Sequence, residues 1–181
     1  MKPIFTIHEG EFLVGDFINR KLVHKFDTWV PTKDSGVDIL VTRNDWQGKA
    51  VGLQVKFSRD FSGPGVWARG VIAGGWFTLD KEKIRRSKAD LWVFAIMTLR
   101  HEQHFVVIPK WELLRRIPRH CGKIWHIYLN ICSGGKCYQV RGLKKSEQLD
   151  AVRHGVKGLR RDFSAFLEKW VLLDKFTGKK R

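Results

Sequence analysis

Two apolar runs carry polar side chains at positions where a strand would normally bury hydrocarbon, and these positions constrain the fold more than any other feature. The runs are VDILVTR (37–43) and KAVGLQVKFS (49–58), separated by NDWQG. Burying a polar group without a partner costs free energy, so Asp38, Gln54 and Lys56 require either a structural partner or a function. The two runs and their short connection predict a pair of long strands joined as a hairpin.

The polar residues of this hairpin are predicted to share one face. Residues two apart on a strand point the same way, so Gln54 and Lys56 point away from Leu53 and Val55. If the first strand pairs antiparallel with the second, Asp38 can lie on that same face. A carboxylate, an amide and an ammonium group would then meet at one end of a sheet.

This set of side chains suits a hard metal ion. Asp38 and Glu11 supply carboxylate oxygens, Gln54 supplies a neutral oxygen, and the main-chain carbonyl of Val55 could add another. An oxygen-only set indicates Mg²⁺, with Mn²⁺ as a possible substitute. Lys56 could orient or deprotonate a water molecule and offset the negative charge that builds on a phosphate under attack.

Each of these residues also has a purely structural explanation. Lys56 could pair with Asp38 across the hairpin, an interaction of small worth if exposed. Glu11 could complement the positive end of its helix, and Asp38 could be satisfied by backbone N–H groups. Three separate coincidences would then be needed in place of one site, so the shared site is the favoured hypothesis.

The charge of the chain indicates a polyanionic partner. Its 181 residues include 34 Lys and Arg against 18 Asp and Glu, a formal net charge of +16 with a pI near 10.1. This excess is larger than solubility requires and favours nucleic acid. A membrane partner is disfavoured, because we find no apolar stretch of about 18 residues and no terminal basic amphipathic helix. The N-terminus lacks the features of a secretory signal, so a cytoplasmic location is expected.

The basic residues of the C-terminal part are predicted to form a phosphate-binding face. Residues 141–181 hold twelve Lys and Arg against five Asp and Glu. Such a face would track phosphates without reading bases. The expected contacts on or near one helix face are Arg153, Lys157, Arg160 and Arg161, with Lys33, Arg59 and Arg69 adding to them nearer the site. Trp67 and Trp76 could stack on bases or wedge between them, although buried aromatic residues are commoner.

The remaining segments predict a single domain with a core over 8–117. A helix is predicted over 9–22, with an apolar stripe at Phe12, Gly15, Ile18 and Leu22. The glycine-rich segment 62–76 lacks either periodicity and is expected to be a long irregular segment or binding loop. The other predicted elements are a strand near 24–30, a charged helix within 80–87, strands at 89–97 and 104–109, and a helix from 109. Three more polar residues are expected on the first helix surface: His8, Glu9 and Asp16.

The C-terminal extension over 123–175 is predicted to contain a hairpin and a long helix, followed by a basic tail at 176–181. The helical stripe contains Leu149, Val152, Val156, Leu159, Phe163, Phe166 and Trp170. Such a stripe indicates core contact or, alternatively, a dimer seam. Cys132 and Cys137 flank Ser-Gly-Gly-Lys, and their spacing fits a tight turn better than any common zinc pattern.

The order of these motifs resembles the PD-(D/E)XK nuclease superfamily, which has the restriction-endonuclease-like fold. The matching features are GEFLVGDFI, then GVDILV, then the triplet Gln54-Val55-Lys56 after a gap of fifteen residues from Asp38. The resemblance covers roughly residues 8–109. It implies an αβββαβ core with a mixed central sheet flanked by helices, and a Mg²⁺-dependent endodeoxyribonuclease of restriction, repair or junction-resolving type.

The resemblance also implies a role for each site residue. Asp38 would be a metal ligand, Gln54 a second ligand, Lys56 the residue that activates water, and Glu11 a support for metal or water. Gln54 stands where the motif has Asp or Glu; this Gln-x-Lys form is similar to Mrr-type restriction enzymes and should bind metal more weakly. The proline of the motif is also displaced, since Pro31 lies seven residues before Asp38.

Several alternatives stay open at this point. A homodimer is expected, because cutting two strands symmetrically usually takes two copies. A non-catalytic DNA-binding module that retains the nuclease fold is the main alternative function. A structure-selective resolvase or an RNA-directed enzyme is a third.

Overall fold

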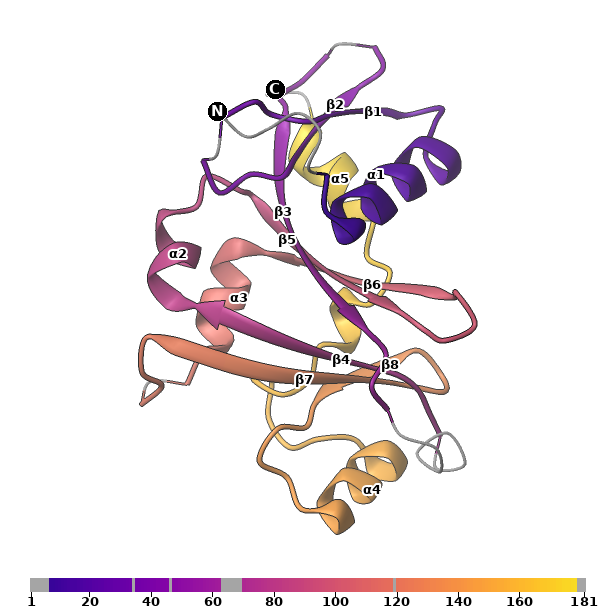
Figure 1. The fold of residues 1–181 in the computed structure, drawn as a ribbon, viewed down its shortest axis with the longest axis vertical. Helices are drawn as coiled ribbons and strands as arrows, with labels where there is room; N and C mark the ends of the chain where they lie inside the picture. Colours follow the sequence, from indigo (N-terminus) through magenta and orange to yellow (C-terminus); the bar gives the residue numbers. More distant parts are fainter. Residues whose placement is uncertain (1–6, 34, 46, 63–69, 119, 179–181) are drawn as a thin grey trace.

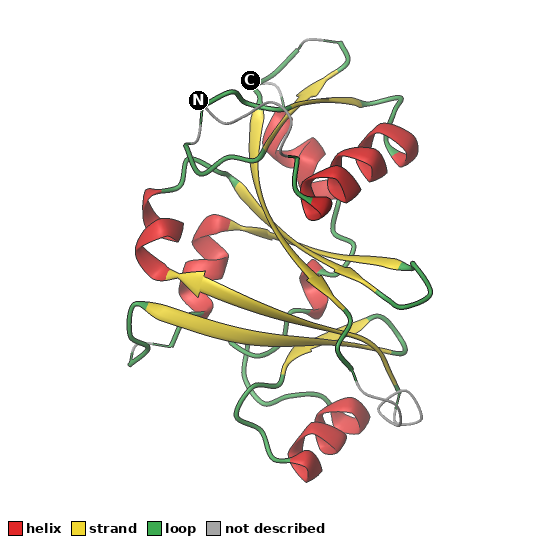
Figure 2. Cartoon of the chain, in the orientation of Figure 1, coloured by secondary structure: helices red, strands yellow, loops and turns green. Residues whose placement is uncertain are grey.

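Two β-sheets packed face to face make up most of the described part of the protein, with helices on their outer sides and at one end of the space between them (Figures 1 and 2). The computed structural model describes residues 7–33, 35–45, 47–62, 70–118 and 120–178. The larger sheet has five strands in the order β1-β2-β3-β5-β6, and the smaller has three in the order β4-β7-β8. The predicted mixed α/β class with helices flanking a mixed central sheet is confirmed.

The five-stranded sheet combines both kinds of strand pairing. Its strands are β1 (Phe26–Trp29), β2 (Ile39–Arg43), β3 (Val51–Arg59), β5 (Leu91–Met97) and β6 (Gln103–Pro109). The β2–β3 pair is antiparallel, as the hairpin prediction required, while β3 and β5 run parallel. Because parallel neighbours need a crossover, the chain between them leaves the sheet and builds β4 and the helix α2 (Lys81–Arg86).

The smaller sheet contains a strand that the sequence prediction missed. β4 (Val71–Asp80) pairs antiparallel with β7 (Ile124–Cys132), which in turn pairs with β8 (Lys136–Gln139). The expectation of an irregular segment at 62–76 was therefore wrong for its last six residues, and 63–69 lies outside the described residues. The Gly74-Gly75 pair hid the strand signal, although buried Phe77 and Leu79 alternate with exposed Trp76.

Two apolar clusters lie on opposite faces of the larger sheet. One cluster fills the space between the sheets, with Trp92, Phe94 and Ile96 of β5 facing residues such as Phe77 and Ile127. The other packs the opposite face of β3 and β5 against α1 (Glu9–Lys21) and α5 (Val171–Thr177). β5 is consequently buried on both faces, as its unbroken apolar sequence predicted.

The predicted first helix is present, but its buried face differs from the predicted stripe. α1 buries Gly10, Glu11, Val14 and Ile18, whereas Phe12 is 61% exposed. The helix turns this face inward because its first turn lies against β3: a Cβ atom added at Gly10 would come within 2.5 Å of the Phe57 Cβ. Close approach to the sheet therefore decides which side of the helix is buried.

The long C-terminal helix predicted from residue 146 is not formed. α4 (Lys145–His154) ends at Gly155, whose φ of 85° suits glycine better than any other residue, and Gly158 has a φ of 86°. A short 3₁₀ helix (Ser164–Phe166) and α5 follow as separate elements. Leu159, placed on the apolar stripe, is 71% exposed. The prediction of a single basic helix face was also wrong, because Arg153 is the one residue of the four that lies on α4.

A buried ion pair holds the C-terminal segment in place of the predicted helix. Arg116, in α3 (Lys110–Arg116), lies 2.9 Å from Glu112, and both side chains are nearly inaccessible. The same guanidinium lies over the rings of Phe163 and Phe166 and donates to the carbonyl of Asp162.

Within the described ranges, no helix has the length and apolar character needed to cross a membrane.

Two glycines of α1 provide a test of this packing. We expect Gly10→Ala to lower the free energy of unfolding by about 1–3 kcal/mol, because the new methyl group would overlap Phe57. Gly15→Ala should instead raise it by about 0.5–1 kcal/mol, since nothing lies within 4 Å of that position. Urea unfolding of the two variants would measure both changes. Equal stabilisation by the two substitutions would contradict the close approach of α1 to β3.

Candidate active site

The site lies at the N-terminal end of β2, beyond which one edge of β3 has no neighbouring strand among the described residues. β2 starts at Ile39, which lies opposite Leu53, so among the described residues no strand pairs with that edge of β3 beyond this point. Asp38 takes the place of a continuing strand. Its backbone N–H donates to the Leu53 carbonyl at 2.8 Å, and its carboxylate accepts the N–H of Val55 at 2.7 Å. The side-chain amide of Gln54 donates to the same carboxylate oxygen.

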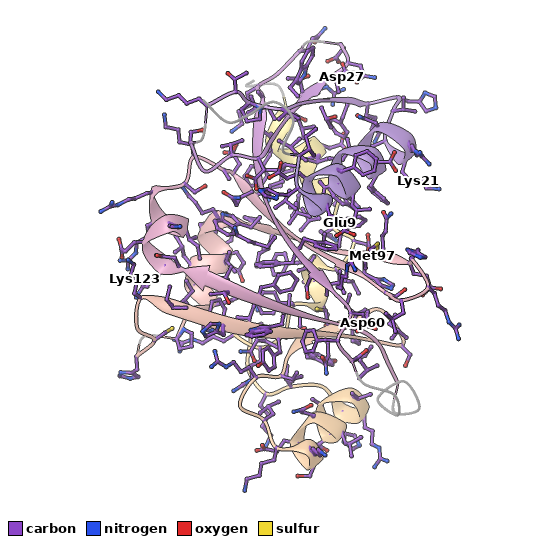
Figure 3. The ribbon with its side chains drawn as sticks, in the orientation of Figure 1. Glu9, Lys21, Asp27, Asp60, Met97 and Lys123 are labelled. Atoms are coloured by element: carbon purple, nitrogen blue, oxygen red, sulfur yellow. The ribbon has the colours of Figure 1, made fainter. Side chains whose placement is uncertain are left out.

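The first turn of α1 covers the same region of β3 and brings in Glu11. This side chain is buried, with 6% of its surface exposed, at the third residue of the helix. The neighbouring Glu9, labelled in Figure 3 at the start of the helix, forms an exposed ion pair with Arg59 at 3.4 Å. Carboxylates near a helix N-terminus are favoured by the helix dipole. The same local sequence therefore starts the helix and supplies an acid to the site.

Lys56 lies on the face of β3 that carries Gln54. Its Nζ lies 5.8 Å from the centroid of the Trp92 ring, and its side chain is half-buried. Within the described ranges its ammonium has neither a hydrogen bond nor an ion pair, and the cross-hairpin pair with Asp38 is not formed. A half-buried ammonium that contacts the Trp92 ring but has no hydrogen bond or ion pair to a described residue can bind a ligand.

A single cleft of about 1110 Å³ gathers the residues predicted for catalysis. Glu11, Asp38, Gln54, Val55 and Lys56 all line it. The end of β4, the helix α2 and the ring of Trp92 provide the rest of its wall. Three predicted metal ligands, the predicted carbonyl ligand and the predicted water-activating lysine are thus brought together by the fold.

The wall formed by α2 carries positive charge into the cleft. Asp80 caps the helix by accepting the N–H groups of Lys83 at 3.1 Å and Glu82 at 2.9 Å, and these bonds hold the pKa of Asp80 below its usual value. Lys83 and Arg86 then line the cleft from this helix, whereas Arg85 points elsewhere and pairs with Glu82 at 2.7 Å. Cations on this wall can bind the phosphates of a polyanion.

The two walls are joined at one end of the cleft. The hydroxyl of Ser87, which follows α2, donates to the carbonyl of Gly36 at 2.5 Å. Gly36 lies two residues before Asp38, and the ammonium of Lys110 donates to the Ser87 carbonyl at 2.8 Å. The position of α2 is therefore coupled to the loop that delivers the Asp38 carboxylate.

Sequence reasoning missed several residues of the cleft. Lys83, Arg86, Trp92 and His8 line it without having been predicted, and Glu9 lies there rather than on a remote helix surface. The only available signal was the charged segment 80–87, whose position opposite β3 depends on the path of β4. Asp16 does lie on the helix surface, in an ion pair with Arg20 at 2.7 Å.

The predicted phosphate-binding residues are dispersed. Lys33 and Arg59 are exposed near the cleft, and Arg69 lies outside the described residues. Arg153 belongs to α4, which Figure 1 shows beyond β7 and β8 on the side opposite α1. Arg161 uses its guanidinium within the protein, donating to Gln139 Oε1 at 2.7 Å and to two main-chain carbonyls. Lys157 and Arg160 are exposed in the loop after α4.

Cys132 and Cys137 flank the tight turn that the sequence predicted. Cys132 ends β7, Cys137 lies in β8, and Gly134 and Gly135 form the turn between them. Burial raises the pKa of the Cys132 thiol to about 11 and raises that of Cys137 further.

No group of three or more His, Cys, Asp or Glu side chains suited to a metal occurs in the part of the chain that the structure describes.

Among the comparisons with known proteins, a likeness is found to a solved structure. No family model and no curated protein matches the chain. A solved structure of the Holliday junction resolvase Hjc from Archaeoglobus fulgidus is similar, at 12% identity and a TM-score of 0.38, over 66% of this chain and 84% of that one.

The contrast between Asp38 and Lys56 predicts different effects on stability. Asp38→Ala should lower the free energy of unfolding by about 1–3 kcal/mol, because the Val55 N–H loses its acceptor. Lys56→Ala should change it by no more than about 0.5 kcal/mol, since its ammonium bonds to no described residue. Urea titration followed by tryptophan fluorescence measures both. A loss at Lys56 as large as that at Asp38 would show that the lysine is a structural cation.

Proposed function

We propose that this protein is a metal-dependent nuclease that hydrolyses phosphodiester bonds in DNA. The observation that carries the proposal is the cleft that holds Glu11, Asp38, Gln54 and the half-buried Lys56 together, with no ion pair between Lys56 and any described residue. Its second wall carries Lys83 and Arg86, and the whole chain has a net charge of +16. A polyanion with a hydrolysable phosphate fits both walls.

The side chains of the cleft have distinct roles in this reaction. A water molecule attacks phosphorus, the bond to the leaving oxygen breaks, and the proton lost by water balances the proton gained by the leaving group. Lys56 orients the water and offsets the charge that grows on the phosphate oxygens. Lys83 and Arg86 hold the phosphate backbone on the opposite wall, which fixes the position of the scissile bond relative to Lys56.

The donor groups fit a hard divalent cation. The carboxylates of Asp38 and Glu11 face the cleft with Gln54, whose Oε1 is left for a ligand because its Nε2 donates to Asp38. The Val55 carbonyl points to the same open strand edge as its N–H, since both groups of one residue point to the same side of a strand. These four groups would hold Mg²⁺ or Mn²⁺. Bound there, the ion would supply Lewis acidity toward the phosphate and the attacking water.

A cleavage assay tests the proposal directly. Supercoiled plasmid, branched DNA and single-stranded DNA would be incubated with the protein and Mg²⁺ or Mn²⁺. We expect metal-dependent cutting by the native protein and a loss of about 100-fold or more in Lys56→Ala and Asp38→Ala, since both remove groups that act on the reacting atoms.

Lys21→Ala and Asp27→Ala are matched controls for this assay. Both residues lie away from the cleft, at the far end of α1 and on β1, as Figure 3 shows, and should leave cutting unchanged. Circular dichroism at the assay temperature would establish that each variant is folded. Cutting that survives in folded Lys56→Ala and Asp38→Ala would assign the activity to another site or to a contaminant.

A non-catalytic DNA-binding protein is the second candidate. Gln54 motivates it, because an amide in place of a carboxylate leaves two acids, Asp38 and Glu11, among the proposed metal ligands, and its Nε2 already donates to Asp38. In that case the native protein would bind DNA but never cut it, with or without metal.

A homodimer, which symmetric cutting would require, is part of the nuclease proposal. The single long helix expected to join two copies is not formed, because α4 and α5 are separate elements of the described chain.

Replacing Gln54 tests the metal site by a second route. We expect Gln54→Glu to increase the rise in melting temperature caused by Mg²⁺, because a third carboxylate strengthens the attraction for the cation. Without metal the variant should be less stable than the native protein, since two carboxylates then repel where an amide donated to Asp38. Thermal unfolding with and without Mg²⁺ measures both effects. An unchanged response to Mg²⁺ would argue against a cation at Gln54.

A further inference from the structure

An exposed row of aromatic rings lies on the outer face of the smaller sheet. Trp76 of β4 stands opposite Tyr128 of β7, with ring centroids 5.8 Å apart. Phe61 extends the row on one side at 5.7 Å from Tyr128, and His126 extends it on the other at 6.2 Å from Trp76. These four residues, which we call the aromatic row, all lie outside the two large apolar clusters.

Two rings of this row face solvent, while His126 and Tyr128 are half-buried and Tyr128 packs against a third, smaller apolar cluster. Trp76 is 52% exposed and Phe61 is 48% exposed, whereas Phe77, the next residue along β4, is 3% exposed in the core. The helix α4 packs over Tyr138 and Val140 at the other end of the sheet and leaves these two rings open. Large flat rings that face solvent provide stacking surface for a ligand.

The aromatic row continues into the cleft. Thr78 follows Trp76 on the same face of β4, lines the cleft, and its hydroxyl lies 2.9 Å from His126 Nδ1. On the other strand edge, the N–H of Trp76 donates to the hydroxyl of Ser58 at 3.0 Å. Ser58 lies two residues beyond Lys56 and therefore on the same face of β3. A chain that leaves the cleft past Thr78 meets Trp76 next.

The charge beside the aromatic row favours a nucleic acid over a protein partner. The Arg141 guanidinium lies 6.0 Å from the Tyr128 centroid and donates to the carbonyl of His126 at 3.3 Å. A cation held against a row of open rings, in a chain of net charge +16, matches a strand that presents both phosphates and base faces.

We propose that the aromatic row stacks on unpaired bases of a DNA strand whose backbone enters the cleft. A fully paired duplex keeps its bases stacked on one another and cannot offer them to Trp76, whereas a single strand, flap or junction can. The inference rests on the proposed function for the path of the backbone. It adds a preference for DNA with unpaired bases, set by a surface that contains none of the proposed catalytic residues.

The test measures binding without cleavage, in the absence of divalent metal. The full chain would be titrated into a labelled single-stranded oligonucleotide, a flapped duplex and a fully paired duplex of equal length. We expect Trp76→Ala to weaken binding of the first two by about 5- to 100-fold, the range for one lost stacking contact, and of the paired duplex by less than about 2-fold. Trp76→Phe should retain most of the affinity. A 2-aminopurine base in the single strand should lose emission on binding the native protein and not on binding Trp76→Ala.

Trp111→Ala is the matched control. Trp111 is 61% exposed, lies on α3 away from the cleft, and also carries an arginine, with the Arg115 guanidinium 5.8 Å from its ring. This variant should bind all three DNAs like the native protein. Equal losses for Trp76→Ala on paired and unpaired DNA would overturn the inference. So would unchanged DNA binding together with loss of a dimer in sedimentation, which would make the row a protein interface.

The result separates the two proposals. A native protein that binds unpaired DNA through Trp76 but never cuts with metal would support the aromatic row and refute the nuclease. If the native protein cuts DNA and Trp76→Ala binds and cuts every substrate as well as the native protein does, the nuclease proposal would be supported and the aromatic row refuted.

Discussion

The parallel pairing of β3 with β5 is the constraint from which the rest of the structure follows. Two neighbouring parallel strands cannot be joined by a tight turn, so the chain between Arg59 and Leu91 must leave the sheet and return. Here it does so as a ten-residue strand and a short helix, β4 and α2. β4 starts the second sheet, whose inner face buries one side of β5. α2 becomes the wall of the cleft that faces Lys56. One connection therefore supplies both the larger part of the core and half of the site.

The other half of the site depends on an incomplete strand pair. Because β2 begins at Ile39, the N–H of Val55 has no strand carbonyl to bond and donates to a side chain in its place. The Asp38 carboxylate satisfies it and is held at the mouth of the cleft by the same bond. Gln54 is satisfied in the same way. Asp38 and Gln54, which seemed costly inside apolar runs, are thus partnered by each other and by the backbone, and the ammonium of Lys56 has no hydrogen bond or ion pair to a described residue. Structural satisfaction and availability for chemistry are divided among adjacent residues.

The sequence predicted best where a short pattern was enough to determine the structure. The hairpin of β2 and β3, the doubly buried β5 and the Cys132–Cys137 turn all follow from local alternation, apolar runs and glycine placement. The prediction failed where distant contacts override such patterns. Phe12 starts a series of three- and four-residue steps through Gly15 to Ile18, yet the close contact of Gly10 with Phe57 leaves it in solvent. The stripe after Ser146 has helical spacing, but the positive φ angles of Gly155 and Gly158 break it, and the Arg116 ion pair holds the segment that follows.

The sequence by itself determined which chemical groups line the cleft. An acid, an amide and a lysine have spacings that place them on or beside adjacent strands, a second acid lies on the first helix, and the net charge is +16. It did so because strand alternation and helix periodicity are local properties. Only the tertiary structure decided what surrounds that chemistry. Lys83, Arg86 and Trp76 lie in the crossover between β3 and β5, Tyr128 and His126 lie on β7, and their positions depend on how the second sheet packs on the first. No local pattern encodes the packing of one sheet on another, because it depends on the shapes of both buried faces together.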